Sequence, residues 1–206
     1  MPSTRTVVIV VFDDAEVLDV FGPFEVFSVT GEREPGNPFR VVLAAEREGP
    51  VKLRHGLSVN PQHRLDDCPR PDLLVVPGGF GTRREMNNPA LISWIQEQAA
   101  GAELVFSICT GALLLARTGM LDGLAATTHA GAMDLLRQVA PKTRLQPGSR
   151  YVDNGKVILA AGISAGIDAS LYLVERLLGT EVAEATAHFM EYHWDRNDDG
   201  IIDEGL

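Results

Sequence analysis

Cys109 is the residue whose position in the sequence points most directly to chemistry. It lies at the junction between an apolar run, Leu104–Ile108, and a helical pattern that starts at Thr110. Ser107 and Gly111 flank it at a distance of two residues, and small neighbours there are typical of the sharp strand-to-helix turn called a nucleophile elbow. A helix N-terminus also favours the thiolate. We therefore expect a nucleophile; the alternative is a small buried apolar residue, which is common for a free cysteine.

A second candidate segment, residues 75–82, contains paired glycines after an apolar run. Glycines such as Gly78 and Gly79 let the backbone approach a ligand closely and point N–H groups at it. We expect the N–H groups of Gly79 and Thr110 to form an oxyanion hole for reactions of Cys109, with Gly78 contributing to substrate binding. The alternative is an ordinary turn between a strand and a helix. The segment has neither the GxGxxG pattern of dinucleotide binding nor the GK[ST] of a phosphate-binding loop.

Asp19 stands between Leu18 and Val20, inside an apolar patch of the sequence. Partial desolvation should raise the pKa of its carboxyl group towards the useful range for an acid or base. A nearby thiolate on Cys109 would act in the same direction, so that the two groups share one proton. The alternative is that Asp19 caps a helix. The other acidic residues of this segment are expected to form a solvated turn: Asp13, Asp14 and Glu16.

His129 ends another short apolar segment, 20 residues after Cys109. A cysteine nucleophile needs a base within hydrogen-bond reach, which makes His129 a candidate base; the alternative is a structural histidine. The remaining histidines are expected to be solvated or to have no special role: His55, His63, His188 and His193. The sequence has no HExxH and no CxxC, so we expect no metal site of the zinc type.

The chain ends in an acidic tail from about residue 195. Its residues fit positions 1, 3, 5, 6 and 9 of a calcium-binding loop, starting at Asp195 and including Asn197 and Asp199. Position 12 falls on Leu206, where such a loop needs a bidentate glutamate. We therefore expect an acidic soluble tail, and calcium binding stays the alternative.

The elements that must position these residues alternate between strands and helices. Continuous apolar runs are typical of strands covered on both faces, and they occur at Val7–Phe12, Val41–Ala44, Leu73–Val76, Leu104–Ile108 and Val157–Ala161. The helical patterns between them are Val17–Phe27, with a kink or restart at Gly22-Pro23, then Asn88–Ala100, Thr110–Arg117, Ala132–Ala140, Ser164–Leu178 and Glu181–His193. This alternation predicts an α/β fold whose mainly parallel sheet is sandwiched by helices on both faces.

Length and composition limit the class of protein. A chain of 206 residues, 45% hydrophobic and 22% charged, predicts one globular domain over residues 1–206 and excludes a disordered or fibrous protein. The formal charge of −10 argues against nucleic acid and anionic membranes as partners. Two cysteines, Cys68 and Cys109, are too few for a disulfide scaffold. No apolar stretch has the length of a bilayer span or the pattern of a signal peptide, so we expect a cytoplasmic protein with reduced thiols.

The motifs around these residues resemble the ThiJ/PfpI family, a branch of the flavodoxin-like, class I glutamine-amidotransferase-like superfamily. The resemblance covers about residues 5–193 and begins with the elbow, the Pro-Gly-Gly before it and the Thr-Thr-His after it. Four motifs look like the isonitrile hydratase branch: Leu18–Phe27, Cys109–Gly111, Ala126–His129 and Ala165–Asp168. The same four motifs also mark the ligand-side domains of AraC-type regulators.

The resemblance implies an active site made of an aspartate, a cysteine and the threonine after it, which fall on Asp19, Cys109 and Thr110. The histidine of the wider family falls on His129. The resemblance also implies a homodimer that acts on a small molecule without a cofactor, and in this branch a hydro-lyase that converts an isonitrile into an N-substituted formamide. The acidic tail has no counterpart in the family pattern.

Two alternative functions remain open at this stage. One is another thiol reaction of the family, on a glyoxal-type aldehyde, with His129 as the base of Cys109. The other is a ligand- or redox-sensing domain without turnover, because an elbow thiol is readily oxidised. An AraC-type regulator needs a helix-turn-helix domain, and so few residues follow position 193 that we do not expect this chain to bind DNA by itself.

Overall fold

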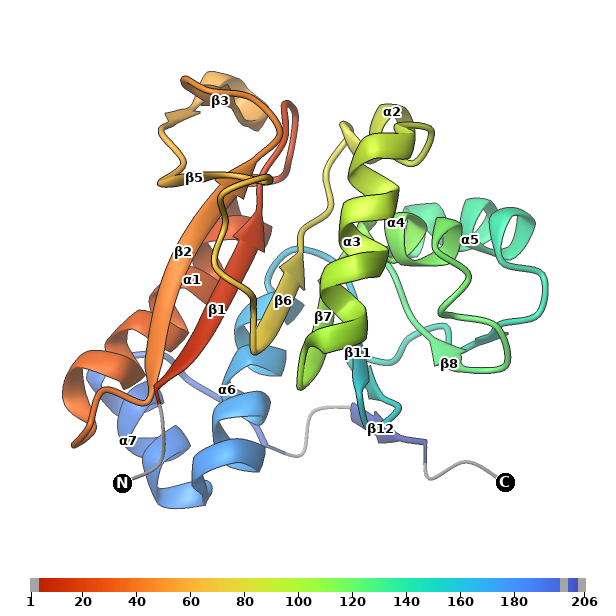
Figure 1. The fold of residues 1–206 in the computed structure, drawn as a ribbon. Coiled ribbons are helices and arrows are strands. Elements are labelled where there is room, and N and C mark those ends of the chain that lie inside the picture. The colour runs from red at the N-terminus through yellow and green to blue at the C-terminus, as the bar shows by residue number, and fades with distance from the viewer. Residues whose placement is uncertain (1–3, 197–199, 204–206) are drawn as a thin grey trace.

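An eight-stranded sheet forms the centre of the computed structural model, which describes residues 4–196 and 200–203 (Figure 1). In spatial order its strands are β12 (Gly200–Ile202), β10 (Tyr151–Asp153), β11 (Val157–Ala160), β7 (Leu104–Ile108), β6 (Leu73–Val76), β1 (Arg5–Val10), β2 (Phe39–Ala45) and β5 (His63–Arg64). Neighbouring strands pair in parallel, except for the antiparallel pair β10–β11. The prediction of a mainly parallel sheet is confirmed.

Helices cover both faces of this sheet, which is why its central strands are apolar without alternation. On one face lie α1 (Val17–Arg33), α6 (Ala165–Leu178) and α7 (Thr180–Phe189); on the other lie α3 (Pro89–Gly101), α4 (Gly111–Arg117) and α5 (Met133–Val139) (Figure 1). Residues 7–10 of β1 and all four residues of β6 have no exposed surface. The predicted sandwich is therefore confirmed.

Short elements complete the described chain. They are the helix α2 (Thr82–Glu85), the 3-10 turns η1 (Arg54–Gly56) and η2 (Ala130–Ala132), the antiparallel pair β3 (Val51–Lys52) and β4 (Ser58–Val59), and the parallel pair β8 (Ala125–Ala126) and β9 (Arg144–Leu145). The sequence predicts a strand that ends at His129, near β8, and none of the others, because elements of two to four residues are too short to show periodicity.

Helix α1 corrects one prediction, because it runs without restart through Gly22 and Pro23 to Arg33. Proline inside a helix leaves one carbonyl without its donor, here that of Asp19. Tertiary packing compensates: a Cβ atom at Gly22 would lie 3.0 Å from Cγ1 of Ile167 on α6, so α1 and α6 approach closely at this point. Helix α7 also ends earlier than predicted, at Phe189.

The order of the strands brings the candidate site together. Strand β1 lies between β2 and β6; the chain leaves β1 through α1 towards β2, whereas it leaves β6 through α3 towards β7, in the opposite direction. Ligands of open α/β sheets bind where the connections diverge in this way, at the carboxyl ends of the strands. The segments that follow β1, β6 and β7 carry Asp19, Gly78 and Cys109 respectively.

The tail contributes an edge strand to the sheet. Strand β12 pairs in parallel with β10, and the N–H of Asp203 donates to the carbonyl of Asp153 (2.8 Å). The calcium-loop hypothesis depends on Asn197 and Asp199, which lie outside the described residues. The single domain over residues 1–206 stays a prediction. Among residues 4–196 and 200–203, no helix combines the length and apolar character needed to cross a membrane.

Candidate functional site

Cys109 lies at a sharp turn between β7 and α4. Its φ of 54° is in the left-handed region, which a non-glycine residue occupies only where surrounding structure enforces it. Here the Cys109 N–H donates to the carbonyls of Ala160 (3.0 Å) and Ala161 (2.8 Å). A Cβ atom at Gly111 would lie 2.1 Å from the carbonyl oxygen of Val76, so only glycine fits there. The small neighbours in the sequence therefore have the steric reason expected of an elbow.

The sulfur of Cys109 is nearly enclosed, since the residue is 5% exposed. The backbone N–H groups of Thr110 and Ile163 face the thiol and lower its pKa, but burial first and the negative charge of Asp19 second raise the pKa to about 12. This corrects the expectation that the helix N-terminus favours the thiolate. Helix α4 has only seven residues, and its N-terminal N–H groups do not offset the loss of water around the sulfur.

Asp19 is fully buried in the first turn of α1. Its Oδ2 atom accepts a hydrogen bond from the Gly78 N–H (2.9 Å), whereas its Oδ1 atom makes no hydrogen bond within the described structure. Burial raises the pKa of the carboxyl group to about 7, against the opposing effect of the Gly78 N–H, and the charge of Glu16 raises it further. The Cys109 thiol lies within hydrogen-bonding reach of this carboxyl group. The structure thus brings the expected acid and the expected nucleophile together.

Gly78 is the point at which three strands' connections meet. A Cβ atom there would lie 2.4 Å from the backbone nitrogen of Thr110 and 2.9 Å from Asp19 Oδ2. Any side chain would therefore displace either the acid or the first residue after the nucleophile. The pattern of paired glycines marks this position in the sequence for a steric reason.

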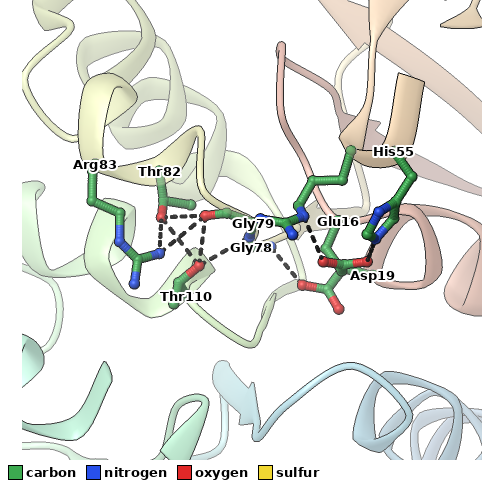
Figure 2. Close-up of polar contacts among 9 residues, drawn as sticks. Glu16, Asp19, His55, Gly78, Gly79, Thr82, Arg83 and Thr110 are labelled. Carbon is green, nitrogen blue, oxygen red and sulfur yellow. Dashed lines mark hydrogen bonds and ion pairs between the residues drawn. The ribbon is translucent and has the colours of Figure 1, made fainter. Parts of the chain in front are cut away.

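The Thr110 hydroxyl belongs to a buried hydrogen-bond network with the turn after β6 (Figure 2). It accepts from the Gly79 N–H (2.9 Å) and donates to the Gly79 carbonyl (3.0 Å), to which the Thr82 hydroxyl also donates (2.7 Å). The expected oxyanion hole is therefore not formed as predicted: the Gly79 N–H is used by Thr110, and that of Gly78 by Asp19. The donors that remain near the sulfur are the Thr110 and Ile163 N–H groups.

Glu16 is part of the site, which corrects the expectation of a solvated acidic turn. Its side chain is only 16% exposed and forms ion pairs with Arg54 (3.4 Å) and His55 (3.9 Å). Figure 2 shows Glu16 and Asp19 side by side. The spacing of three residues, one helical turn, is the signal in the sequence that places both carboxyl groups on one face. Asp13 and Asp14 are exposed, as expected.

His129 lies at the start of η2 and does not hydrogen bond with Cys109 in the described structure. Its Nδ1 atom accepts from the Gly131 N–H (3.1 Å), and its ring packs against Gly162, where a Cβ atom would lie 2.6 Å from Cδ2. The contact with the elbow comes from the preceding residue instead, because the Thr128 hydroxyl donates to the Cys109 carbonyl (2.6 Å). His129 thus lies near the elbow with its Nδ1 atom occupied, and its role as a base of Cys109 stays a prediction.

Sequence reasoning missed Ile163, Thr82 and Arg83. Ile163 has a φ of 45°, which is rare for a β-branched residue, and this conformation aims its N–H at the sulfur. No sequence signal reveals it. Thr82 and Arg83 follow the glycine pair closely, and Arg83 donates to the Gly79 carbonyl (3.1 Å) and the Thr82 hydroxyl (3.2 Å).

A cavity of about 670 Å³ lies over the carboxyl ends of β1 and β2, between them and the start of α3. Its apolar floor includes Phe12 and Leu91 and its rim includes Glu46 and Arg84. Cys109, Asp19 and Thr110 do not line it. The described residues contain no cluster of three or more histidine, cysteine or acidic side chains placed to hold a metal ion.

Comparison with known proteins defines the class that this fold and site indicate. The model of the DJ-1/PfpI family matches residues 5–176, and the chain therefore belongs to the DJ-1/PfpI family. A structure titled as a ThiJ/PfpI family protein from Pseudomonas syringae superposes with a TM-score of 0.84, at 26% identity over 95% of this chain and 78% of that one. Drosophila melanogaster DJ-1beta shares the fold, with a TM-score of 0.79 over 93% of this chain and all of that one, at 20% identity.

Two curated relatives are similar in sequence. The isonitrile hydratase of Pseudomonas putida is 34% identical over 88% of this chain and 75% of its own length. The transcriptional regulator CdhR of Pseudomonas aeruginosa is 33% identical over 76% of this chain. The match spans only about half of that regulator's length, at 49%. The family therefore contains both an enzyme and a regulator among the relatives of this chain.

Proposed function

We propose that this chain is a cysteine-dependent isonitrile hydratase, which converts an isonitrile into an N-substituted formamide. The observation that carries the proposal is the buried Asp19 carboxyl group, with a pKa of about 7 and a free Oδ1 atom, beside the Cys109 thiol. The carbon of an isonitrile holds a lone pair and becomes a good electrophile only when it takes up a proton. A nucleophile next to a proton carrier meets that need. The similarity to the Pseudomonas putida isonitrile hydratase supports the same reading.

In the first step, one proton moves from the thiol through the carboxyl group to the substrate. Because the thiol pKa is about 12, Cys109 rests as the neutral thiol, and Asp19 is the group next to it that can accept its proton. Asp19 takes the proton and delivers it to the isonitrile carbon while the sulfur adds to that carbon. The product is a thioimidate, R–N=CH–S, bonded to Cys109, and Asp19 is again a carboxylate.

In the second step, water adds to the thioimidate. The Asp19 carboxylate accepts one proton from the water, whose oxygen bonds to the carbon, and passes that proton to the substrate nitrogen. The intermediate R–NH–CH(OH)–S then collapses: the C–S bond breaks, R–NH–CHO leaves, and the hydroxyl proton passes to the sulfur of Cys109. In the structure the Thr110 hydroxyl donates to the Gly79 carbonyl. During the reaction this hydroxyl would release that carbonyl and hold the substrate nitrogen or the water instead.

Turnover of an aliphatic isonitrile such as n-butyl isonitrile tests the proposal. We expect N-butylformamide to form, and the NMR signal of its formyl proton measures how fast it does. Cys109→Ser should lower kcat by at least about 10³-fold, the scale of losing a nucleophile. Mass spectrometry of the wild-type protein during turnover should find one whole substrate added to Cys109. A Cys109→Ser protein that keeps the full rate would refute the scheme.

The aldehyde alternative requires His129 as the base of Cys109; no hydrogen bond joins the two within the described residues, and the Gly131 N–H occupies Nδ1. His129→Ala is therefore the matched control for the assay. We expect this variant to keep most of its hydratase activity, whereas a glyoxal-type reaction with His129 as the base would be lost. Methylglyoxal, offered beside the isonitrile, separates the two reactions directly.

A sensing role without turnover is favoured by one observation, the similarity to the regulator CdhR. The structure weighs against redox sensing, because a thiol with a pKa of about 12 and 5% exposure is a poor target for peroxide. If no isonitrile is consumed while a ligand still protects Cys109 from alkylation, the sensing role holds. The homodimer, the small-molecule substrate and the cytoplasmic location stay predictions.

A further inference from the structure

The substituent of the substrate must lie at the rim of the site, because the sulfur is nearly enclosed. An isonitrile group is linear and thin, so it can reach a residue that is 5% exposed while the rest of the substrate stays outside. Two exposed apolar side chains mark this rim: Phe80 (65% exposed), directly after Gly79, and Ile163 (38% exposed), whose N–H faces the sulfur. The residues around Phe80 therefore decide which substituent the site accepts.

Two guanidinium groups lie near the Phe80 ring, and they differ in their electrostatic partners. The carbon at the centre of the Arg54 guanidinium lies 4.1 Å from the ring centroid, and that of Arg83 lies 5.4 Å away. Arg54 is neutralised by its ion pair with Glu16. Arg83 forms no ion pair with a carboxylate in the described part of the chain; its Nη1 atom binds the Gly79 carbonyl and the Thr82 hydroxyl.

The position of Arg83 places its charge within reach of the reaction site. Its hydrogen-bond partners, Gly79 and Thr82, both bond to the Thr110 hydroxyl. Figure 2 shows the guanidinium beside Thr110, on the opposite side of the glycine pair from Asp19. A substrate whose isonitrile carbon lies at Asp19 would meet the Arg83 guanidinium if its other end passes the glycine pair. The Nη2 group of Arg83 makes no hydrogen bond in the described structure, so it has donors left for that end.

We infer that the natural substrate is an isonitrile that carries a negatively charged group, such as a carboxylate, and that Arg83 binds this group. The inference rests on the proposed hydratase function and adds the substrate class. A planar guanidinium with free donors matches the geometry of a carboxylate. The formal charge of the chain is −10, so an anionic substituent near the site needs a cation that no carboxylate neutralises. Partial burial at the rim strengthens the attraction relative to the open surface.

A structural role for Arg83, as a brace of the Gly79 carbonyl, is the competing explanation. Arg83→Gln separates the two, because the glutamine amide can still donate to this carbonyl but carries no charge. Arg84→Gln is the matched control: it removes the same charge from the next residue, whose side chain points elsewhere and pairs with Glu85 (2.7 Å) and Asp14 (3.6 Å).

The test compares 4-isocyanobenzoate with its neutral isostere 4-isocyanobenzamide, and the 3-isomers of both. For the wild-type protein we expect kcat/KM to favour the anions. In Arg83→Gln, KM for the anions should rise by about 10- to 100-fold, the scale of a charge-assisted hydrogen bond, while KM for the amides stays nearly unchanged. Arg83→Lys should recover part of the preference and Arg84→Gln should retain it. Added salt should weaken it.

The outcomes distinguish this inference from the proposed function. If the amides are hydrated and neither isomer of the anion is favoured over them, the hydratase function stands and the role of Arg83 is refuted. The same conclusion follows if Arg83→Gln affects both charge types equally, as a brace would. If no isonitrile is hydrated, the proposed function fails. Calorimetric titration with benzoate then tests whether Arg83 forms an anion site. Binding to the wild type that Arg83→Gln abolishes supports the site, and equal or absent binding in both proteins refutes it.

Discussion

Two buried aspartates, Asp19 and Asp168, occupy equivalent places on neighbouring helices and have opposite surroundings. Each lies in the first turn of its helix, α1 or α6, and these two helices pack together. Their exposed fractions are 0% and 4%. Asp168 accepts hydrogen bonds from Arg150 (2.7 Å) and from the Tyr192 hydroxyl (2.8 Å), whereas Asp19 accepts one from the Gly78 N–H (2.9 Å) and has the Cys109 thiol within hydrogen-bonding reach.

The difference shows how one fold gives the same residue type two environments, one with an ion pair and one in which the carboxyl group can hold a proton near neutral pH. Burial disfavours a carboxylate, and a nearby cation offsets that cost. Asp168 has the cation, and its partner Arg150 also donates to Ser164 (3.1 Å), beside the segment that carries Ile163. Asp19 has no cation within hydrogen-bond distance in the described structure, and so its carboxyl group can hold a proton near neutral pH. Each prediction below changes one side of this comparison.

The largest effect is expected from Asp19→Asn, which keeps the shape of the side chain and removes the proton carrier. Isonitrile hydration should fall by about 10²- to 10⁴-fold in kcat, the usual contribution of a general acid or base. Asp168→Asn, measured beside it, should lower kcat much less. Equal losses in the two variants would contradict the distinction between the reactive and the structural aspartate.

The second-largest effect is expected in how the stability of the fold depends on pH. Burial raises the pKa of the Asp19 carboxyl group to about 7 in the folded protein, from an ordinary value of 3.8 that applies to the unfolded chain. Between these two pH values the folded state therefore binds more protons than the unfolded state. Asp19 therefore stabilises the fold fully below about pH 4, and this contribution is lost as the pH rises through about 7. The loss is up to about 4 kcal/mol.

Urea unfolding of wild type and Asp19→Asn across this pH range measures that loss. The free energy of unfolding of wild type should fall, relative to the variant, as the pH rises. Other carboxyl groups titrate equally in both proteins and cancel in the difference. A difference that stays constant with pH would show that the pKa of Asp19 is not raised by folding.

Arg150→Met tests the structural side by removing the cation from Asp168. We expect the free energy of unfolding to fall by about 2–4 kcal/mol, because a buried carboxylate loses its partner; the partial exposure of Arg150 keeps the value below that of a fully enclosed pair. The double variant Arg150→Met/Asp168→Asn should recover part of this loss, since no charge is then left unpaired. Chemical denaturation of four proteins, wild type, the two single variants and the double variant, measures the coupling. If the double variant is less stable than Arg150→Met by the full cost of Asp168→Asn, the two residues act independently.

The smallest effect concerns the reactivity of the thiol. The charge of Asp19 raises the Cys109 pKa, so Asp19→Asn should lower this pKa, and alkylation by iodoacetamide at about pH 8 should become roughly 10-fold faster. Asp168→Asn should leave the alkylation rate as in wild type. Since burial is the larger cause of the raised pKa, the thiol should still react slowly in every variant.

The architecture was predictable from the sequence because burial on two faces leaves a local trace. The central parts of β1, β6 and, apart from Ser107, β7 are apolar without alternation, because helices cover these strands on both sides. Asn88, which accepts from the Ala90 N–H (3.1 Å), marked the start of α3 through its capping side chain. Gly111 was marked by its spacing from Cys109, although the atom that requires a glycine there, the carbonyl oxygen of Val76, lies on β6.

Relations between distant segments were not predictable, because they depend on what the fold brings together. The sequence alone identified Cys109 and Asp19, and the apolar neighbours of Asp19 indicated a raised pKa. Only the tertiary structure decided that burial overrides the helix N-terminus at the sulfur, since the depth of an atom depends on every segment packed over it. The tertiary structure also aims the Ile163 N–H at the thiol. It gives Glu16 its ion pair with Arg54, whereas Arg83 has no carboxylate partner in the described part of the chain. Ion pairs of this kind form between loops that are distant in the sequence, so no local pattern predicts them.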